Sequence, residues 1–233
     1  MDSKQQSKTV SSRFYWIAFV VSSMLFFLGT SVLSLVSAGN IFVSPDETAN
    51  AFFANQFAHT GSLRVADPVS GHFSDQLFPR SIVAKDGFLL PQSFIGLPVL
   101  YGMFVYLFGS WALVVLTPLF AIAAALAFRR ILLSWFSPVI SNSSAILFLL
   151  HPAVWYYSAR GLMHNVLFVC LLMFAVYASV CRPLLHHVQT CPNRYGHLRP
   201  FQEHLDDWIA GLCIGFALMV RTSEVYWIGG LMQ

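Results

Sequence analysis

The sequence predicts an all-α, polytopic membrane protein with about five transmembrane helices and a long outer loop carrying amphipathic juxtamembrane helices. Hydrophobic residues make up 57% of the 233 residues and charged residues only 10%, against about 25% charged residues in soluble domains. Apolar stretches of about 20 residues recur, which is the length a helix needs to cross a bilayer. The net charge of +3 is small, and no basic run is interleaved with aromatic residues, so a nucleic-acid partner is not expected.

Five apolar stretches are long enough to be membrane spans. They are Phe14–Ala38, Trp111–Phe128, Val139–Ser158, Leu162–Cys181 and Trp208–Met232. The first stretch also ends in a sequence like a signal-peptide cleavage site, but its apolar part of about 25 residues is too long for an ordinary signal core. A sixth apolar stretch, 88–108, contains several proline and glycine residues. These residues favour a bent surface or re-entrant helix over a sixth span.

Lysine and arginine predict the direction of the spans, because cytoplasmic loops are enriched in both residues. With five spans, one face collects most of the basic residues: Lys4, Lys8, Arg13, Arg129, Arg130, Arg182, Arg194 and Arg199. We therefore expect a multi-pass protein with a cytoplasmic N-terminus at 1–13 and a first span at 14–38. An extracytoplasmic loop would follow at 39–110, and 111–233 would hold the other four spans with a cytoplasmic loop near 182–207.

The outer loop opens with a helix start signal. Ser44 as N-cap and Glu47 three residues later form a capping box, and Pro45 stands at the favoured first helical position. Apolar residues then recur at helical spacing as far as Gly61, which predicts an amphipathic helix on the outer membrane surface. Farther along, an Asp-Gly pair at 86–87 between apolar stretches predicts a hairpin.

The acid pair Asp46 and Glu47 has two interpretations. As first-turn acids, both are favoured by the helix dipole without any further role. Alternatively, the pair faces a site at the membrane surface. There a carboxylate could act as general base on an acceptor hydroxyl or help to bind a divalent cation. Arg80 and Lys85 in the same loop could contact a phosphate, or they could be ordinary exposed cations.

The sequence gives weaker evidence for a metal-binding site than for the acid pair. His59, His72, His151 and His164 are expected on the outer side and could join the acid pair around a metal ion. No HExxH-type spacing is present, so a divalent cation stays an option without predicted ligands. The cytoplasmic loop carries further histidine and cysteine residues, but their spacing matches no standard zinc pattern and fits a polar connector.

The predicted fifth span contains two charged residues. Arg221 and Glu224 are three positions apart and share one helical face. Charges inside a membrane are costly and suggest a functional role by default. Either the two side chains neutralise each other, or Arg221 binds a phosphate, which an arginine can contact through two nitrogens.

The order of these parts has a counterpart in a known family. The outer loop opens with Ser-Pro-Asp-Glu at 44–47, continues as an aromatic helix at 52–58, and leads through Lys-Asp-Gly at 85–87 to Phe-Ile-Gly-Leu-Pro at 94–98. This order, with a glycine-rich fifth span ending at Arg221, resembles the GT-C superfamily of membrane glycosyltransferases. The closest group is similar to the protein-O-mannosyltransferase and aminoarabinose-transferase-like enzymes.

The resemblance implies transfer of a sugar from a polyprenyl-phosphate donor to a hydroxyl of a protein, lipid or glycan acceptor on the extracytoplasmic face. It implies that Asp46 is the catalytic base or acceptor-positioning acid, with Glu47 beside it. The candidate phosphate contacts are Arg80, Lys85, Arg160 and Arg221. Members of this family are usually longer, so the chain is expected to be an N-terminal part, and the activity of these 233 residues alone stays open.

Two other classes of function stay open. A non-catalytic assembly subunit or truncated remnant would use the outer loop for docking. It would tolerate loss of the acid pair and depend on the face formed by Phe52, Phe53 and Phe57. A small-molecule transporter or channel would need charges in several spans, whereas only the predicted fifth span carries any.

Overall fold

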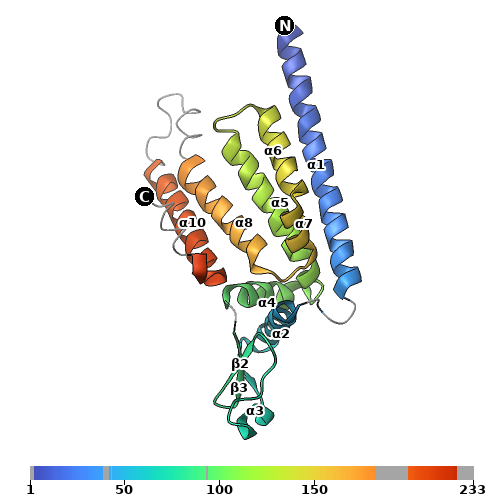
Figure 1. Ribbon diagram of the computed structural model, residues 1–233. Coiled ribbons are helices and arrows are strands. Elements are labelled where there is room, and N and C mark those ends of the chain that lie inside the picture. Colours follow the sequence, from blue (N-terminus) through green and yellow to red (C-terminus); the bar gives the residue numbers. More distant parts are fainter. Residues whose placement is uncertain (1–2, 39–41, 43, 93, 182–198, 225–233) are drawn as a thin grey trace.

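The computed structural model describes residues 3–38, 42, 44–92, 94–181 and 199–224. The protein is mostly helical, and its long helices stand side by side as a layer (Figure 1). These helices are α1 (Ser3–Ala38), α5 (Ala112–Leu132), α6 (Pro138–Leu150), α8 (His164–Val176) and α10 (Arg199–Val220). Across one end of the layer lie α2 (Pro45–Thr60) and α4 (Gly96–Phe108), and a small sheet projects beyond them.

Within the described residues, two helices are long and apolar enough to cross a membrane: Arg13–Val36, which lies inside α1, and α5. Helices α6 and α7 (Pro152–Ala159), bent by 53° relative to each other, make a third if they are counted as one span. The described residues thus form a mostly helical structure with two or three candidate membrane spans. Of the about five expected spans, two or three are found in the described residues, and the end of the predicted fifth span lies outside them.

The difference in span number has local causes. The predicted third span breaks where Pro152 follows His151, because proline has no N–H with which to continue the helical hydrogen bonds. The predicted fourth span is α8 followed by a π-helical turn at Tyr177–Cys181. The predicted fifth span starts inside α10, whose first turns are polar and belong to the loop expected near 182–207. Residues 182–198 and 225–233 lie outside the described part.

A small antiparallel sheet corrects the all-α expectation. Its strands, in the order β1-β3-β2, are β1 (Val65–Ala66), β2 (Ile82–Lys85) and β3 (Phe88–Pro91). Asp86 and Gly87 join β2 to β3 with φ values of 54° and 75°, the backbone that a two-residue hairpin turn needs. The Asp75 carboxylate accepts hydrogen bonds from both turn amides, at 2.6 and 3.0 Å. The predicted hairpin is therefore confirmed.

The short helix α3 (Pro68–His72) lies between β1 and β2. Asp67 is its N-cap and accepts hydrogen bonds from the backbone amides of Val69 and Ser70. The Ser70 hydroxyl lies 2.5 Å from the same carboxylate. These hydrogen bonds lower the pKa of Asp67 below its ordinary value, and the bond from the Ser70 side chain has the largest effect.

Helix α2 begins and ends at the predicted residues. The Ser44 hydroxyl accepts from the Glu47 amide, and the Glu47 carboxylate accepts from the Ser44 amide at 2.9 Å. Gly61 ends the helix with a φ of 67°, a left-handed value that glycine adopts without steric cost. The capping box and the glycine stop are both confirmed.

Helix α2 packs against α4 on one side and the sheet on the other. A Cβ atom on Gly102 would lie 2.7 Å from the carbonyl oxygen of Ala54, so the two helix backbones nearly touch there. Phe53 is fully buried and packs with Ile82 of β2. The main hydrophobic core is a separate cluster that joins α2 and α4 to α5, α8 and α10, and another core joins α1, α5 and α6. Helix α2 is therefore fixed to the end of the helical layer.

Candidate functional site

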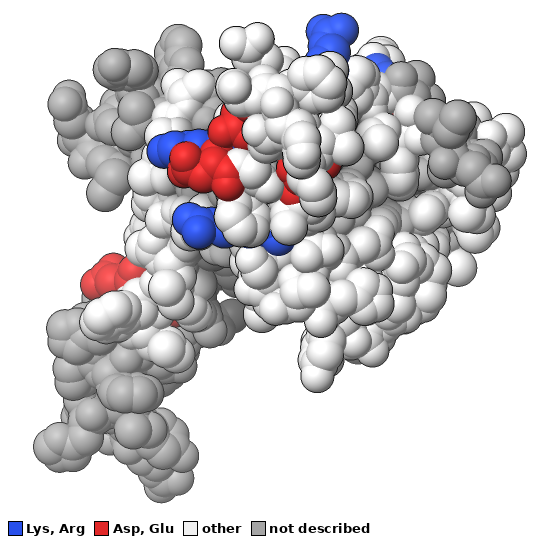
Figure 2. Space-filling model, turned by 90° about the horizontal axis from the view of Figure 1, so that it is seen from below, with Lys and Arg blue, Asp and Glu red and all other residues white. Residues whose placement is uncertain are grey.

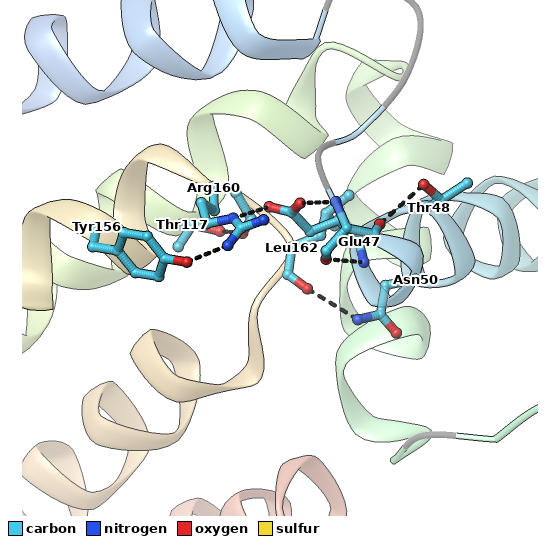
Figure 3. Close-up of polar contacts among 9 residues, drawn as sticks. Glu47, Thr48, Asn50, Thr117, Tyr156, Arg160 and Leu162 are labelled. Atoms are coloured by element: carbon cyan, nitrogen blue, oxygen red, sulfur yellow. Dashed lines mark hydrogen bonds and ion pairs between the residues drawn. The ribbon is translucent and has the colours of Figure 1, made fainter. Parts of the chain in front are cut away.

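Glu47 and Arg160 meet where α2 approaches the turn between α7 and α8 (Figure 3). The Glu47 side chain is only 1% exposed, and its Oε1 lies 3.6 Å from Arg160 Nε. Its other oxygen, Oε2, accepts the hydrogen bond from the Ser44 amide. The guanidinium of Arg160 also donates to the Tyr156 hydroxyl and lies 5.1 Å from the centre of that ring. Both carboxylate oxygens of Glu47 are thus engaged inside the protein.

The backbone after Arg160 is held from two sides. Gly161 has a φ of 78°, and its carbonyl oxygen accepts a hydrogen bond from the buried Thr117 hydroxyl of α5. The next carbonyl, that of Leu162, accepts from the buried Asn50 amide of α2 at 2.9 Å. Because these contacts come from α2 and α5, they fix the position of Arg160 relative to both helices.

Asp46 has different surroundings from Glu47. Its side chain is exposed, and its Oδ1 accepts a hydrogen bond from the hydroxyl of Ser81, which directly precedes β2. Ser81 has a φ of 67°, which is uncommon for a residue with a side chain. Arg80 is exposed directly beside it. Asp46 is therefore the member of the acid pair that faces solvent.

Arg221 lies directly after the end of α10 and not within a continuous helix, which corrects the expectation of an intrahelical charge. Its guanidinium donates to the Asn165 side-chain oxygen in the first turn of α8. The ring of the neighbouring His164 lies edge-on to the Phe94 ring, with the ring centres 5.7 Å apart. The side chain of Glu224 lies outside the described part, so the alternative pairing with Arg221 is not tested.

The two predicted cations of the sheet have different positions. Arg80 is next to the residue that contacts Asp46. Lys85 is exposed at the far end of β2, about 13 Å farther along an extended strand. Figure 2 shows acidic and basic side chains gathered at this end of the molecule, whereas most of the surrounding described surface carries neither. The structure thus separates Lys85 from Asp46.

In the described part of the chain, no three His, Cys, Asp or Glu side chains lie together so that they could hold a metal ion. His151 caps α7 by accepting a hydrogen bond from the Ala153 amide at 3.2 Å. His59 and His72 are exposed. The divalent cation that the sequence left open therefore has no ligand group among these residues.

Sequence reasoning missed several side chains of this region: Asn50, Thr117, Tyr156 and Asn165. Of these residues, Asn50 could have been identified from the sequence, since it stands three residues after Glu47 and shares its helical face.

The alternative function as an assembly subunit expected Phe52, Phe53 and Phe57 to form one docking face, and the structure differs from that expectation. Phe53 is buried, the Phe57 ring lies close to Gly102 of α4, and of the three only Phe52 is exposed.

Comparison with family models, with curated proteins and with solved structures finds no match to this chain. Its fold and composition define an integral membrane protein that is mostly helical, with two or three candidate spans in the described residues. The likeness to a glycosyltransferase family rests on the order of the sequence motifs.

Proposed function

We propose that the chain is an integral membrane glycosyltransferase of GT-C type, or the N-terminal part of one. It would transfer a sugar from a polyprenyl-phosphate donor to an acceptor hydroxyl on the extracytoplasmic face. One observation carries the proposal: the exposed Asp46 accepts a hydrogen bond from Ser81 and is adjacent in the chain to Glu47, whose carboxylate contacts Arg160. A candidate general base and a candidate anion-binding cation are thus both held at the start of α2.

In this proposal, Asp46 takes the proton of the acceptor hydroxyl. The acceptor oxygen forms a bond to the sugar C1 while the bond from C1 to the phosphate oxygen breaks, and the polyprenyl phosphate leaves with the electron pair. The hydrogen bond from the Ser81 hydroxyl to Asp46 supports this role, because an acceptor hydroxyl would approach the same oxygen.

The remaining charged groups have supporting roles. Glu47 is a positioning residue, since its buried carboxylate holds Arg160. Arg160 and Arg221 would stabilise the charge that develops on the leaving phosphate, a role to which the guanidinium fork is suited. Arg80 precedes Ser81, the residue that contacts Asp46, and would be the nearer of the two sheet cations, whereas Lys85 is about 13 Å farther along β2.

The test uses the full chain in membrane vesicles. The probes are polyprenyl-phosphate mannose, glucose and aminoarabinose, each with a short-chain alcohol as acceptor, and the readout is released polyprenyl phosphate. We expect release with at least one donor, and a rate lowered about 10²- to 10⁴-fold by Asp46→Asn. Asp86→Asn removes the same charge at the hairpin turn, where Asn tolerates the positive φ, and should leave the rate unchanged.

Two results would contradict the proposal. Transfer by Asp46→Asn at the wild-type rate would exclude Asp46 as the base. No release from any donor by the folded wild-type chain would contradict activity of these 233 residues alone and favour the assembly-subunit alternative.

A further inference from the structure

The other end of the helical layer, away from α2 and α4, carries a second group of polar side chains. Arg13 begins the first candidate span, and Arg129 and Arg130 lie in the last turn of α5, the second candidate span. In Figure 1, this end of α5 and the start of α6 lie beside α1. Three cations therefore stand where two neighbouring spans reach the edge of the apolar region.

Arg129 is held in a defined orientation by two contacts. Its Nε donates to the side-chain oxygen of Asn142 in α6 at 2.6 Å, and its guanidinium carbon lies 4.4 Å from the centre of the Trp16 ring. A guanidinium has five N–H donors, so the contact with Asn142 leaves four for another acceptor. Among the described residues, no acidic side chain pairs with Arg129, Arg130 or Arg13.

Asn142 supplies an independent observation. Its side chain is fully buried, yet its Nδ2 has no hydrogen-bond partner. The orientation of this amide is fixed, because a guanidinium only donates and so must face the oxygen. A buried N–H group without an acceptor is costly and uncommon. The two N–H donors of this nitrogen therefore lack an acceptor, next to a cation that has no counter-ion among the described residues.

The helix dipole explains only part of this arrangement. Basic residues in the last turn of a helix are stabilised by the negative end of the dipole, which accounts for Arg129 and Arg130 in α5. The dipole does not explain why Arg129 turns to a buried amide, or why that amide keeps an unpartnered N–H. An anion with several acceptor oxygens would supply the acceptor that this amide lacks.

We propose that Arg13, Arg129, Arg130 and Asn142, together called the Arg129 site, bind the phosphate of an anionic phospholipid head group. A phosphodiester only accepts hydrogen bonds, so it suits both the Asn142 amide and the guanidinium fork.

The surroundings favour a lipid over free phosphate. Trp16, Trp135 and Phe136 are 40%, 56% and 50% exposed near the cations, and such aromatic side chains are enriched at the membrane–water boundary. Basic groups at this depth attract anionic lipids. This inference is independent of the proposed transferase activity.

The experiment uses the full chain in nanodiscs of phosphatidylcholine with a minor share of phosphatidylglycerol, and native mass spectrometry measures the retained phosphatidylglycerol. Asn142→Asp keeps the oxygen that faces Arg129 but replaces the donor with a negative charge. We expect it to lower the retained phosphatidylglycerol about tenfold. Gln76→Glu adds the same charge at an exposed position in the sheet region and should change nothing.

A second variant tests the proposal in case the Asn142→Asp chain does not fold. Arg130 is exposed at the end of α5, and Arg130→Gln should reduce retention about fivefold without disturbing the core. Retention at the wild-type level in a folded Asn142→Asp chain, or in Arg130→Gln, would overturn the proposal. So would displacement of phosphatidylglycerol by an equal concentration of inorganic phosphate, because the site would then bind free phosphate.

Discussion

Asp46 and Glu47 are adjacent in the chain, yet one side chain faces solvent and the other is almost completely buried. The capping box causes this difference, because the Glu47 carboxylate must turn back to the Ser44 amide and so points toward Arg160. Asp46 takes no part in the capping box, and its exposed carboxylate accepts a hydrogen bond from the Ser81 hydroxyl. Two acids of similar chemistry thus have different surroundings, and in the proposed transferase Glu47 positions Arg160 while Asp46 takes the proton.

The first prediction concerns the buried ion pair. Glu47→Gln should lower the free energy of unfolding by about 1–3 kcal/mol, since Arg160 would lose its counter-charge. The value lies at the low end for buried pairs because the Arg160 side chain is 21% exposed and can still be solvated. Thermal unfolding of the full chain in a mild detergent measures this change.

Asp46→Asn is the matched control for Glu47→Gln, because it makes the same chemical change at the exposed neighbouring position. It should change the free energy of unfolding by about 0.5 kcal/mol or less. Equal destabilisation by both variants would show that the Glu47–Arg160 contact contributes no more to the free energy of unfolding than the exposed Asp46 carboxylate does.

At the scale of elements, the contact between α2 and α4 decides where the acid pair lies. The two helices approach so closely at Gly102 that any side chain there would press on the α2 backbone. Gly96, at the start of α4, makes a similar approach to the backbone of Met219 and Val220 in α10. Small residues thus allow α4 to link α2 to the last described helix of the layer.

The second prediction tests this contact. Gly102→Ala should cost about 1–3 kcal/mol, because its Cβ would lie 2.7 Å from the Ala54 carbonyl oxygen and one helix must shift. Gly211→Ala in α10 meets no atom within 4 Å and should be neutral or stabilise the chain by up to about 1 kcal/mol. Thermal unfolding compares the two variants, and equal midpoints would refute the close-packing argument.

The elements differ in how far the sequence predicted them. The start and end of α2 and the turn at 86–87 were predictable, because caps and tight turns depend on a few adjacent residues. The break at Pro152 was visible in the sequence as a proline, but the spans were predicted from hydropathy, which does not take helix-breaking residues into account. The start of α10 at Arg199 was missed, because hydropathy does not distinguish a polar helical extension from a loop.

At the scale of the whole molecule, the sheet and the Arg129 site lie at opposite ends of the helical layer (Figure 1). If α1 and α5 cross the membrane, these two ends face opposite compartments. The predicted orientation places the sheet outside the cytoplasm, because most basic residues of the predicted loops collect at the other end.

The third prediction tests this arrangement with single cysteines. Asp86→Cys at the hairpin turn and Phe136→Cys after α5 are introduced into a chain whose native cysteines are replaced: Cys170, Cys181, Cys191 and Cys213. In sealed cells, a membrane-impermeant maleimide should label position 86, and it should label position 136 only after permeabilisation. Labelling of both positions in sealed cells would exclude a membrane between the two ends.

The sequence by itself determined the membrane class, the capped helix after the first span, the hairpin turn and the acid pair. These features depend on composition or on residues a few positions apart, so neighbouring side chains are enough to specify them. Only the tertiary structure decided that Glu47 is buried against Arg160, a residue more than a hundred positions away. It also decided that Asp46 meets Ser81, and that Asn142 is buried with an unpartnered N–H beside Arg129. Burial and long-range pairing depend on how the helices pack, and no local pattern records that packing.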